Sequence, residues 1–220
     1  MAEKAKGGFV TLEGGEGAGK STQIQRLADA LTDASLPVIT TREPGGSPGA
    51  EAIRSLLVEG AVDRWDAITE LLLHYAARRD HLAQTILPAL QSGTWVICDR
   101  FADSTMAYQG YGLSLGRAVV EQAHALAVGD MRPDLTIILD VPLDVGLARA
   151  RERDGDGANR YERMEQGFHQ RIRDGFLDIA KREPERCVVI DATADADTVH
   201  ASILDAVKRR LGLSLEGSTA

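Results

Sequence analysis

The sequence has little cysteine and no long apolar run. Its two cysteines, Cys98 and Cys187, cannot form a disulfide framework, and both lie in apolar segments where a small buried side chain is expected. No segment approaches the roughly eighteen apolar residues of a membrane-spanning helix, and Met1–Gly8 does not resemble a signal peptide. We therefore expect one domain over residues 1–220, in the cytoplasm and away from membranes.

The sequence also lacks an excess of positive charge. Its 25 Lys and Arg residues face 33 Asp and Glu residues, which gives a formal net charge of −8. Proteins that bind nucleic acid or an anionic membrane usually present a dominant basic face, so neither partner is expected. A small anionic ligand remains possible, because it needs only a few local cations.

Short β-branched segments alternate with longer segments of helical period. Such alternation predicts crossover connections and a five-stranded parallel sheet covered by helices on both faces. The predicted strands are Phe9–Glu13, Val38–Thr41, Trp95–Asp99, Thr136–Asp140 and Val188–Asp191. A long helix is predicted from about Ala67 to Gln91, with Ile68, Leu72 and Tyr75 on its buried stripe. Further helices are predicted over roughly Arg117–Val128, Leu143–Arg151, Glu162–Lys181 and Thr198–Leu211, before a polar tail, Gly212–Ala220.

A phosphate-binding motif follows the first predicted strand. The segment Gly14-Gly15-Glu16-Gly17-Ala18-Gly19-Lys20-Ser21 matches G-x-x-x-x-G-K-[ST] between a strand and an amphipathic helix. Glycines allow successive backbone N–H groups to face phosphate oxygens, and the helix adds its positive end. Lys20 is expected to reach the β- and γ-phosphates, and the Ser21 hydroxyl to hold Mg²⁺. The segment predicts a nucleoside-triphosphate site.

The rest of the chain narrows the class of nucleotide-binding protein. A GTPase would need the base-recognition motif Asn-Lys-x-Asp, but the only asparagine is Asn159, in Asn-Arg-Tyr-Glu. Motor and AAA-type ATPases usually need a longer chain. A kinase of small molecules suits the length best.

An acidic residue ends the third predicted strand, Trp95–Asp99. Four apolar residues before Asp99 resemble a Walker B strand, whose acid lies near the metal. The alternative is an aspartate that only caps the next turn. Arg100 follows directly, at the sheet edge where such folds bind ligands.

Several arginines indicate a second anion site. Arg42, Arg54, Arg78 and Arg100 lie at loop tips or helix edges, where each alone could simply be solvated. Together they suit a bidentate cradle for a second phosphate.

A further group of arginines surrounds the glycine-rich segment Asp154–Ala158. Arg149 and Arg153 share one helical face, with Arg151 and Arg160 nearby. A mixed-charge solvated surface is one interpretation. The other is a short arginine-rich lid, at about residues 149–161, that closes over phosphate.

Taken together, these segments resemble those of the bacterial thymidylate kinases, and they occur in the same order from about Phe9 to Leu211. The resemblance rests on the phosphate loop together with Thr41-Arg42-Glu43-Pro44-Gly45-Gly46, Tyr75-Ala76-Ala77-Arg78, Asp99-Arg100-Phe101, Ser104-Thr105-Met106-Ala107-Tyr108-Gln109-Gly110 and Arg132-Pro133-Asp134. It implies a three-layer α-β-α P-loop kinase fold and transfer of the ATP γ-phosphoryl group to dTMP, giving dTDP. It also implies Mg²⁺ and a homodimer.

The resemblance also implies roles for individual residues. The nucleotide-binding set is Gly14, Gly15, Glu16, Gly17, Ala18, Gly19, Lys20, Ser21 and Thr22, and the metal-binding set is Ser21 and Asp99. The acceptor-binding set is Glu43, Arg54, His74, Arg78, Arg100, Ser104, Thr105, Tyr108 and Gln109. Within it, Arg78, Thr105 and Gln109 match base contacts, Tyr108 matches the ring at the sugar 2′ position, and Arg54 and Arg100 match cations on the acceptor phosphate.

Two departures from the family pattern affect these roles. The family commonly has Phe four residues before Arg78, where this sequence has His74. Stacking on the base would therefore come from His74, from the neighbouring Tyr75 after a shift, or from neither. The motif after the lid is Asn159-Arg160-Tyr161-Glu162 in place of the usual Asp-Arg-x-Glu, which leaves the donor contacts of Arg160 open.

The acceptor phosphate is already anionic, so no general base is required. Catalysis then depends on positioning and on neutralisation of charge, and we expect Lys20, Arg153, Arg149, Arg100 and Glu16 to carry it. Three other functions remain open, of which a pure scaffold fits least because it has no need for Lys20 with Ser21. The other two are kinase and switch functions. One is another nucleoside-monophosphate or deoxynucleoside kinase on the same fold, and the other is an ATP-dependent regulatory switch.

Overall fold

The computed structural model describes residues 7–154, 160–213 and 215, without the side chains of Arg153 and Asp154. Nearly all of the predicted glycine-rich segment, Asp154–Ala158, and residues 214 and 216–220 of the predicted tail lie outside this description. Among the described helices, none combines the length and the apolar character that a membrane crossing requires.

A five-stranded parallel sheet forms the centre of the described residues. Its strand order is β2-β3-β1-β4-β5, so successive strands are joined by crossovers. The strands are β1 (Phe9–Glu13), β2 (Val38–Arg42), β3 (Trp95–Asp99), β4 (Leu135–Asp140) and β5 (Cys187–Asp191). The predicted strands are confirmed, with shifts of one residue at three of the ends.

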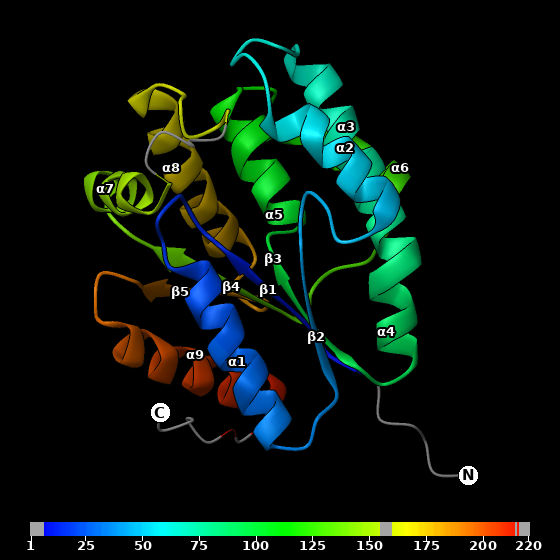
Figure 1. Ribbon diagram of the computed structural model, residues 1–220, viewed down its shortest axis with the longest axis vertical. Coiled ribbons are helices and arrows are strands. Elements are labelled where there is room, and N and C mark those ends of the chain that lie inside the picture. The colour runs from blue at the N-terminus through cyan, green and yellow to red at the C-terminus, as the bar shows by residue number, and fades with distance from the viewer. Residues whose placement is uncertain (1–6, 155–159, 214, 216–220) are drawn as a thin grey trace.

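Helices cover both faces of the sheet, as Figure 1 shows. On one face lie α1 (Lys20–Asp33) and α9 (Ala196–Leu211), which contact each other and the strands. The remaining helical segments are α2 (Pro48–Val58), α3 (Ala67–His81), η1 (Leu82–Ile86), α4 (Leu87–Gln91), α5 (Ala102–Thr105), η2 (Met106–Gly112), α6 (Arg117–Ala127), α7 (Leu143–Asp154) and α8 (Gln166–Arg182). The three-layer α-β-α prediction is confirmed.

Alternation along the strands separates two apolar cores. Phe9 of β1 packs in the core beneath α3, α6 and α8, whereas its neighbour Val10 packs in the core beneath α1 and α9. Side chains that alternate between the two faces of a strand produce this division. All five strands run in the same direction, so their carboxyl ends meet at one edge, which carries the site described below.

The long predicted helix has the expected extent, but it is not α-helical throughout. Residues 82–86 form a π-helical turn, η1, in which the N–H of Leu87 bonds to the carbonyl of Leu82. Pro88 follows at the start of α4 and has no N–H to continue the regular ladder, so the hydrogen bonding changes register before it.

The predicted stripe on this helix is wrong at its start. Ile68 and Leu72 are 44% and 56% exposed. The buried face of α3 instead carries Glu70, Arg78 and His81 beside its apolar residues. Apolar periodicity misplaced the face because polar side chains point inward here.

Candidate active site

A cleft of about 490 Å³ opens at the carboxyl edge of the sheet. The predicted site residues converge on it from distant parts of the chain. Lining it are Glu16, Gly17, Ala18, Gly19, Lys20, Ser21, Thr22, Glu43, Arg54, His74, Arg78, Asp99, Arg100, Ser104, Thr105, Tyr108, Gln109 and Arg149. Gly14 and Gly15 instead line a small hollow behind the phosphate loop.

The phosphate loop joins β1 to α1 and is tightly packed from behind. Gly14 has φ +132°, and a Cβ there would lie 2.4 Å from the carbonyl oxygen of Leu139. Gly17 has φ +67°, and a Cβ there would lie 2.0 Å from the carbonyl oxygen of Gly146 on α7. Glycine at these positions lets the loop curl against β4 and α7 while α1 begins at Lys20.

Lys20 lies at the base of the loop and is buried. Its Nζ donates to the carbonyl oxygens of Gly14, at 3.3 Å, and Gly15, at 3.1 Å. Burial and the nearby Arg100 lower the pKa of Lys20, and the carboxylate of Asp99 acts in the opposite direction. Asp99 itself holds a buried Oδ1 that has no hydrogen-bond partner among the described residues. An oxygen without a partner, next to a lysine and the start of α1, suits a cation or its water.

Arg100 is held in one position by four groups. Its backbone is left-handed, at φ +69°, and its N–H donates to the carbonyl of Leu12. Its guanidinium donates to the Gly14 carbonyl at 3.0 Å, the Ser104 hydroxyl at 3.1 Å and the Glu16 carboxylate at 3.0 Å. A non-glycine residue in this conformation needs such support, and it is typical of functional sites.

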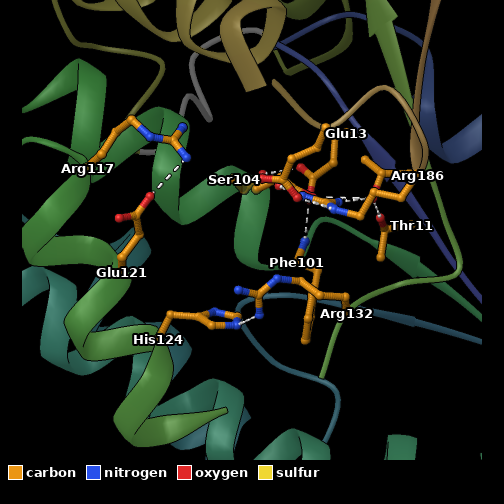
Figure 2. Close-up of polar contacts among 12 residues, drawn as sticks. Thr11, Glu13, Phe101, Ser104, Arg117, Glu121, His124, Arg132 and Arg186 are labelled. Atoms are coloured by element: carbon orange, nitrogen blue, oxygen red, sulfur yellow. Dashed lines mark hydrogen bonds and ion pairs between the residues drawn. The ribbon is translucent and has the colours of Figure 1, made fainter. Parts of the chain in front are cut away.

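Glu13 supports the same turn from the end of β1. Its carboxyl group accepts from the N–H of Phe101 at 2.7 Å and from the Ser104 hydroxyl at 2.5 Å, as Figure 2 shows. Burial and the neighbouring Asp103 raise the pKa of Glu13 to about 8. Sequence reasoning did not select Glu13, since a strand-end acid before a glycine loop carries no motif of its own.

Tyr108 closes the space above Arg100. The tyrosine hydroxyl donates to Glu16 Oε1 at 2.8 Å, and the Arg100 guanidinium lies 5.0 Å from the ring centroid. Glu16 therefore joins the phosphate loop to the acceptor side of the cleft. Burial raises the pKa of Tyr108 despite the opposing charge of Arg100, so the hydroxyl stays protonated.

Arg78 is buried in the wall of the cleft and is only 2% exposed. Its Nε donates to Glu43 at 2.7 Å, and its Nη2 donates to the Phe101 carbonyl at 3.0 Å and the Thr105 hydroxyl at 2.9 Å. Its Nη1 is buried and has no partner among the described residues. The cleft thus contains a fixed donor that no described residue accepts from.

Gln109 presents the complementary case. Its Nε2 donates to Glu70 at 2.8 Å, and its Oε1 is buried with no partner among the described residues. Buried polar atoms without partners are costly in a folded protein, which makes a ligand the natural partner for both atoms.

His74 and Tyr161 lie together at the cleft. The His74 Nε2 and the Tyr161 hydroxyl are 2.9 Å apart, and their ring centroids are 6.2 Å apart with a tilted arrangement. Burial, followed by the charges of Arg78, Arg160 and Arg100, lowers the pKa of His74 to about 3, so the imidazole is neutral. Tyr75, the other predicted stacking residue, is buried beside His124 and does not line the cleft.

The two remaining arginines of the predicted cradle differ in role. Arg54 donates to the Pro44 carbonyl and lines the cleft, whereas the more exposed Arg42 also pairs with Glu51 at 3.2 Å. Both residues line the cleft.

The predicted lid arginines separate into two groups. Arg149 lies on α7 at the cleft, where its guanidinium donates to the carbonyls of Ala192 and Thr193, and Arg151 is exposed on the same helix. The Arg153 side chain lies outside the described residues. Arg160 is only 2% exposed and pairs with Glu70, so it does not extend toward a donor phosphate.

These features occur together in P-loop phosphotransferases that hold a second phosphorylated substrate beside the nucleotide loop. The chain matches the family model described as thymidylate kinase over residues 12–203. It is 58% identical over 208 residues to thymidylate kinase of Caulobacter vibrioides, covering 94% of this chain and 99% of that one. It is 52% identical to thymidylate kinase of Nitrobacter hamburgensis, covering 94% and 90%.

A solved structure supports the same assignment. The crystal structure of thymidylate kinase from Ehrlichia chaffeensis matches with a TM-score of 0.73 and 38% identity, covering 92% of this chain and 99% of that one. The chain belongs to the thymidylate kinase family.

Proposed function

We propose that this protein transfers the γ-phosphoryl group of ATP to dTMP and releases dTDP. The observation that carries the choice of acceptor is the pair of unused polar atoms in the cleft, the donor Arg78 Nη1 and the acceptor Gln109 Oε1. Thymine offers an acceptor, O4, beside a donor, N3–H, and so complements this pair. Cytosine offers the opposite arrangement, with an amino donor beside an N3 acceptor.

The rest of the acceptor follows from this placement of the base. Arg100 and Arg54 supply cations for the monophosphate, and their forked geometry suits bidentate contact. The fixed ring of Tyr108 fills the space that a ribose 2′-hydroxyl would need, which favours a deoxyribose. His74, neutral and beside the cleft, is the side chain we assign to stacking on the base.

The donor half of the cleft suits ATP with Mg²⁺. Backbone N–H groups of the phosphate loop and Lys20 would hold the phosphates, and Ser21 with Asp99 would hold the metal, directly or through water. Among the described residues no group of three or more His, Cys, Asp or Glu forms a metal cage. Mg²⁺ in kinases is held mainly by phosphates, water and one or two side chains, and it neutralises charge on the transferred group.

The chain's own residues contribute position and charge. The attacking phosphate oxygen needs no base, so the two nucleotides must be aligned and the developing charge neutralised. We assign this neutralisation to Lys20, Arg100, Arg149 and Arg153. To Glu16 we assign the role of holding Arg100 in place.

We also propose a homodimer through the outer face of α3 and α6. Ile68 and Leu72 of α3 and Leu126 of α6 are 44%, 56% and 88% exposed, and the two helices are in contact. Apolar side chains gathered on neighbouring helices are typical of a self-complementary interface. Sedimentation of the wild type and of Leu72→Glu would test this proposal, and a monomeric wild type would contradict it.

Since both nucleotides are cytoplasmic metabolites, we place the enzyme in the cytoplasm.

A panel of acceptors in a coupled assay for ADP release tests the function. We expect turnover with dTMP, weaker turnover with ribose analogues and almost none with dCMP or purine monophosphates. Equal turnover with several acceptors would favour a broader nucleoside-monophosphate kinase. ADP release that is independent of any acceptor would favour a regulatory switch.

A further inference from the structure

Glu70 lies behind the base-binding side of the cleft and does not line it. It is 2% exposed and projects from the first turn of α3. Its Oε1 accepts from Gln109 Nε2 at 2.8 Å, and its Oε2 accepts from the Arg160 guanidinium. One carboxylate therefore joins a residue of the cleft to Arg160, near the end of the predicted lid at residues 149–161.

Arg160 is fixed as firmly as its partner. Its guanidinium donates to the carbonyls of Leu57 and Val62, both at 3.1 Å, and to the Tyr161 hydroxyl at 3.2 Å. A buried cation with this many acceptors cannot leave Glu70 without the loss of several hydrogen bonds. Glu70 is consequently held in place from the side opposite Gln109.

A carboxylate between these two partners determines which end of the Gln109 amide faces it. Both carboxylate oxygens accept hydrogen bonds, and an amide has one donor end and one acceptor end. If the amide were reversed, Gln109 Oε1 would face an acceptor in a buried environment, with no hydrogen between them. Orientations of amide groups are assigned from such hydrogen-bond networks, and this network permits only one.

We propose that Glu70 is a positioning residue for base specificity, which fixes the Gln109 amide so that its oxygen accepts the N3–H of thymine. This inference rests on the proposed function, since it concerns how the same cleft rejects cytosine. Without Glu70, the amide could reverse and offer N–H to the N3 of cytosine. Glu70 thus sets the part of the preference that depends on Gln109, without touching the nucleotide, while the Arg78 donor is held independently of it.

Glu70→Gln tests the inference sharply because Arg160 dictates how the introduced amide turns. Arg160 offers only donors, so the oxygen of the introduced amide must face Arg160 and its NH₂ group must face Gln109. Gln109 is then satisfied only in the reversed orientation. We expect kcat/KM to fall for dTMP and to rise for dCMP, so that their ratio drops at least about tenfold. Phosphate and sugar contacts are common to both acceptors and cancel in this ratio.

Two further variants locate the effect in Gln109. In a Gln109→Leu background, Glu70→Gln should leave the dTMP/dCMP ratio within about twofold, because the amide on which Glu70 acts is absent. Glu70→Asp withdraws the carboxylate by one methylene but keeps an acceptor for Arg160. It should weaken dTMP turnover without a gain for dCMP, and it decides the question if Glu70→Gln does not fold.

Asp103→Asn provides a matched control. Asp103, in α5, is a buried acid, 6% exposed, that pairs at 2.7 Å with Arg186, which is labelled in Figure 2. This variant should lower the melting temperature and leave the dTMP/dCMP ratio unchanged.

The outcomes separate the inference from the function on which it rests. A wild type that phosphorylates dCMP as well as dTMP removes the proposed function. A wild type that discriminates, with folded Glu70 variants that keep its ratio, overturns the inference alone. The inference is also overturned if Asp103→Asn lowers the ratio as much as Glu70→Gln, or if the Glu70→Gln effect persists without Gln109.

Discussion

The two halves of the cleft are built in different ways. The donor half comes from one continuous segment, Gly14 to Thr22, between β1 and α1. The acceptor half is assembled from side chains far apart in the chain. Arg78 bonds to Glu43, 35 residues away, Gln109 to Glu70, 39 residues away, and Arg160 to Glu70, 90 residues away. A local motif identifies the first half, whereas only the folded chain brings the second together.

The largest effect is expected in the donor half. Lys20→Ala should lower kcat by about 10³-fold or more, because the variant loses the cation that neutralises charge on the transferred group. The acceptor contacts lie on other elements, so calorimetric binding of dTMP should be nearly unchanged. Turnover close to wild type would remove Lys20 from the mechanism.

The lid arginines test whether α7 belongs to the donor half. Arg153→Ala and Arg149→Ala should each lower kcat. For Arg153→Ala we expect a decrease of at least about 10²-fold, near the low end of the decreases seen when an arginine that stabilises the transition state is lost. The Kd for dTMP should change little, and lysine should restore activity only in part. Arg151→Ala, on the exposed face, serves as the control. If kcat stays within a few-fold of wild type for both variants, the catalytic cation lies elsewhere.

Tyr108 tests the sugar side of the acceptor half. Tyr108→Ala should narrow the preference for deoxyribose over ribose acceptors by roughly tenfold in kcat/KM, because the ring no longer fills the 2′ space. Tyr108→Phe keeps the ring and removes only the hydroxyl that donates to Glu16. It should retain the sugar preference and lower turnover. An unchanged preference in the alanine variant would assign discrimination to another side chain.

Substitution of His74 should give the smallest effect, a change in how the free energy of unfolding depends on pH. The folded pKa of about 3 lies below the ordinary value of 6.5, so protonation favours the unfolded chain. The stability that neutral His74 contributes is complete above pH 6.5 and declines as the pH falls toward 3. His74→Phe should therefore lose less stability than the wild type between about pH 7 and 5, measured by urea unfolding. If wild type and variant lose the same stability over this pH range, His74 takes up no proton on unfolding.

His74 also tests stacking. His74→Phe should preserve or improve the affinity for dTMP, and His74→Ala should weaken it. Equal affinities in all three proteins would mean that the base stacks on no side chain at this position.

Strands and the phosphate loop were predictable because their signals are local. Alternating apolar segments, a glycine motif and an acid at the end of β3 need no knowledge of distant residues. The buried face of α3 was not predictable, because Glu70, Arg78 and His81 are buried only through partners on other elements. Ile68 and Leu72 carry the apolar period that predicted the opposite face, yet they are 44% and 56% exposed.

Arg160 shows the same limit within the site. Its charge and its position beside a glycine-rich segment suggested a contact with phosphate. In the folded chain it lies against α2 and α3 instead, since Leu57, Val62 and Glu70 supply its acceptors. Sequence could place the residues from Asp99 at the end of β3 to Gln109, and also Glu16 and Glu43, which hold Arg100 and Arg78. It could not place Glu13 and Glu70, which hold the Phe101 N–H and Gln109.

The contact between Gly17 and Gly146 limits how this sequence can diverge. A Cβ on Gly17 would meet the Gly146 carbonyl oxygen, and a Cβ on Gly146 would lie 2.6 Å from the Glu16 carbonyl oxygen. A larger residue at either position requires α7 to move away from the loop, and α7 carries Arg149. Homologues with a side chain at position 17 should therefore show a compensating change in α7, so that Gly17 and Gly146 are retained or replaced together.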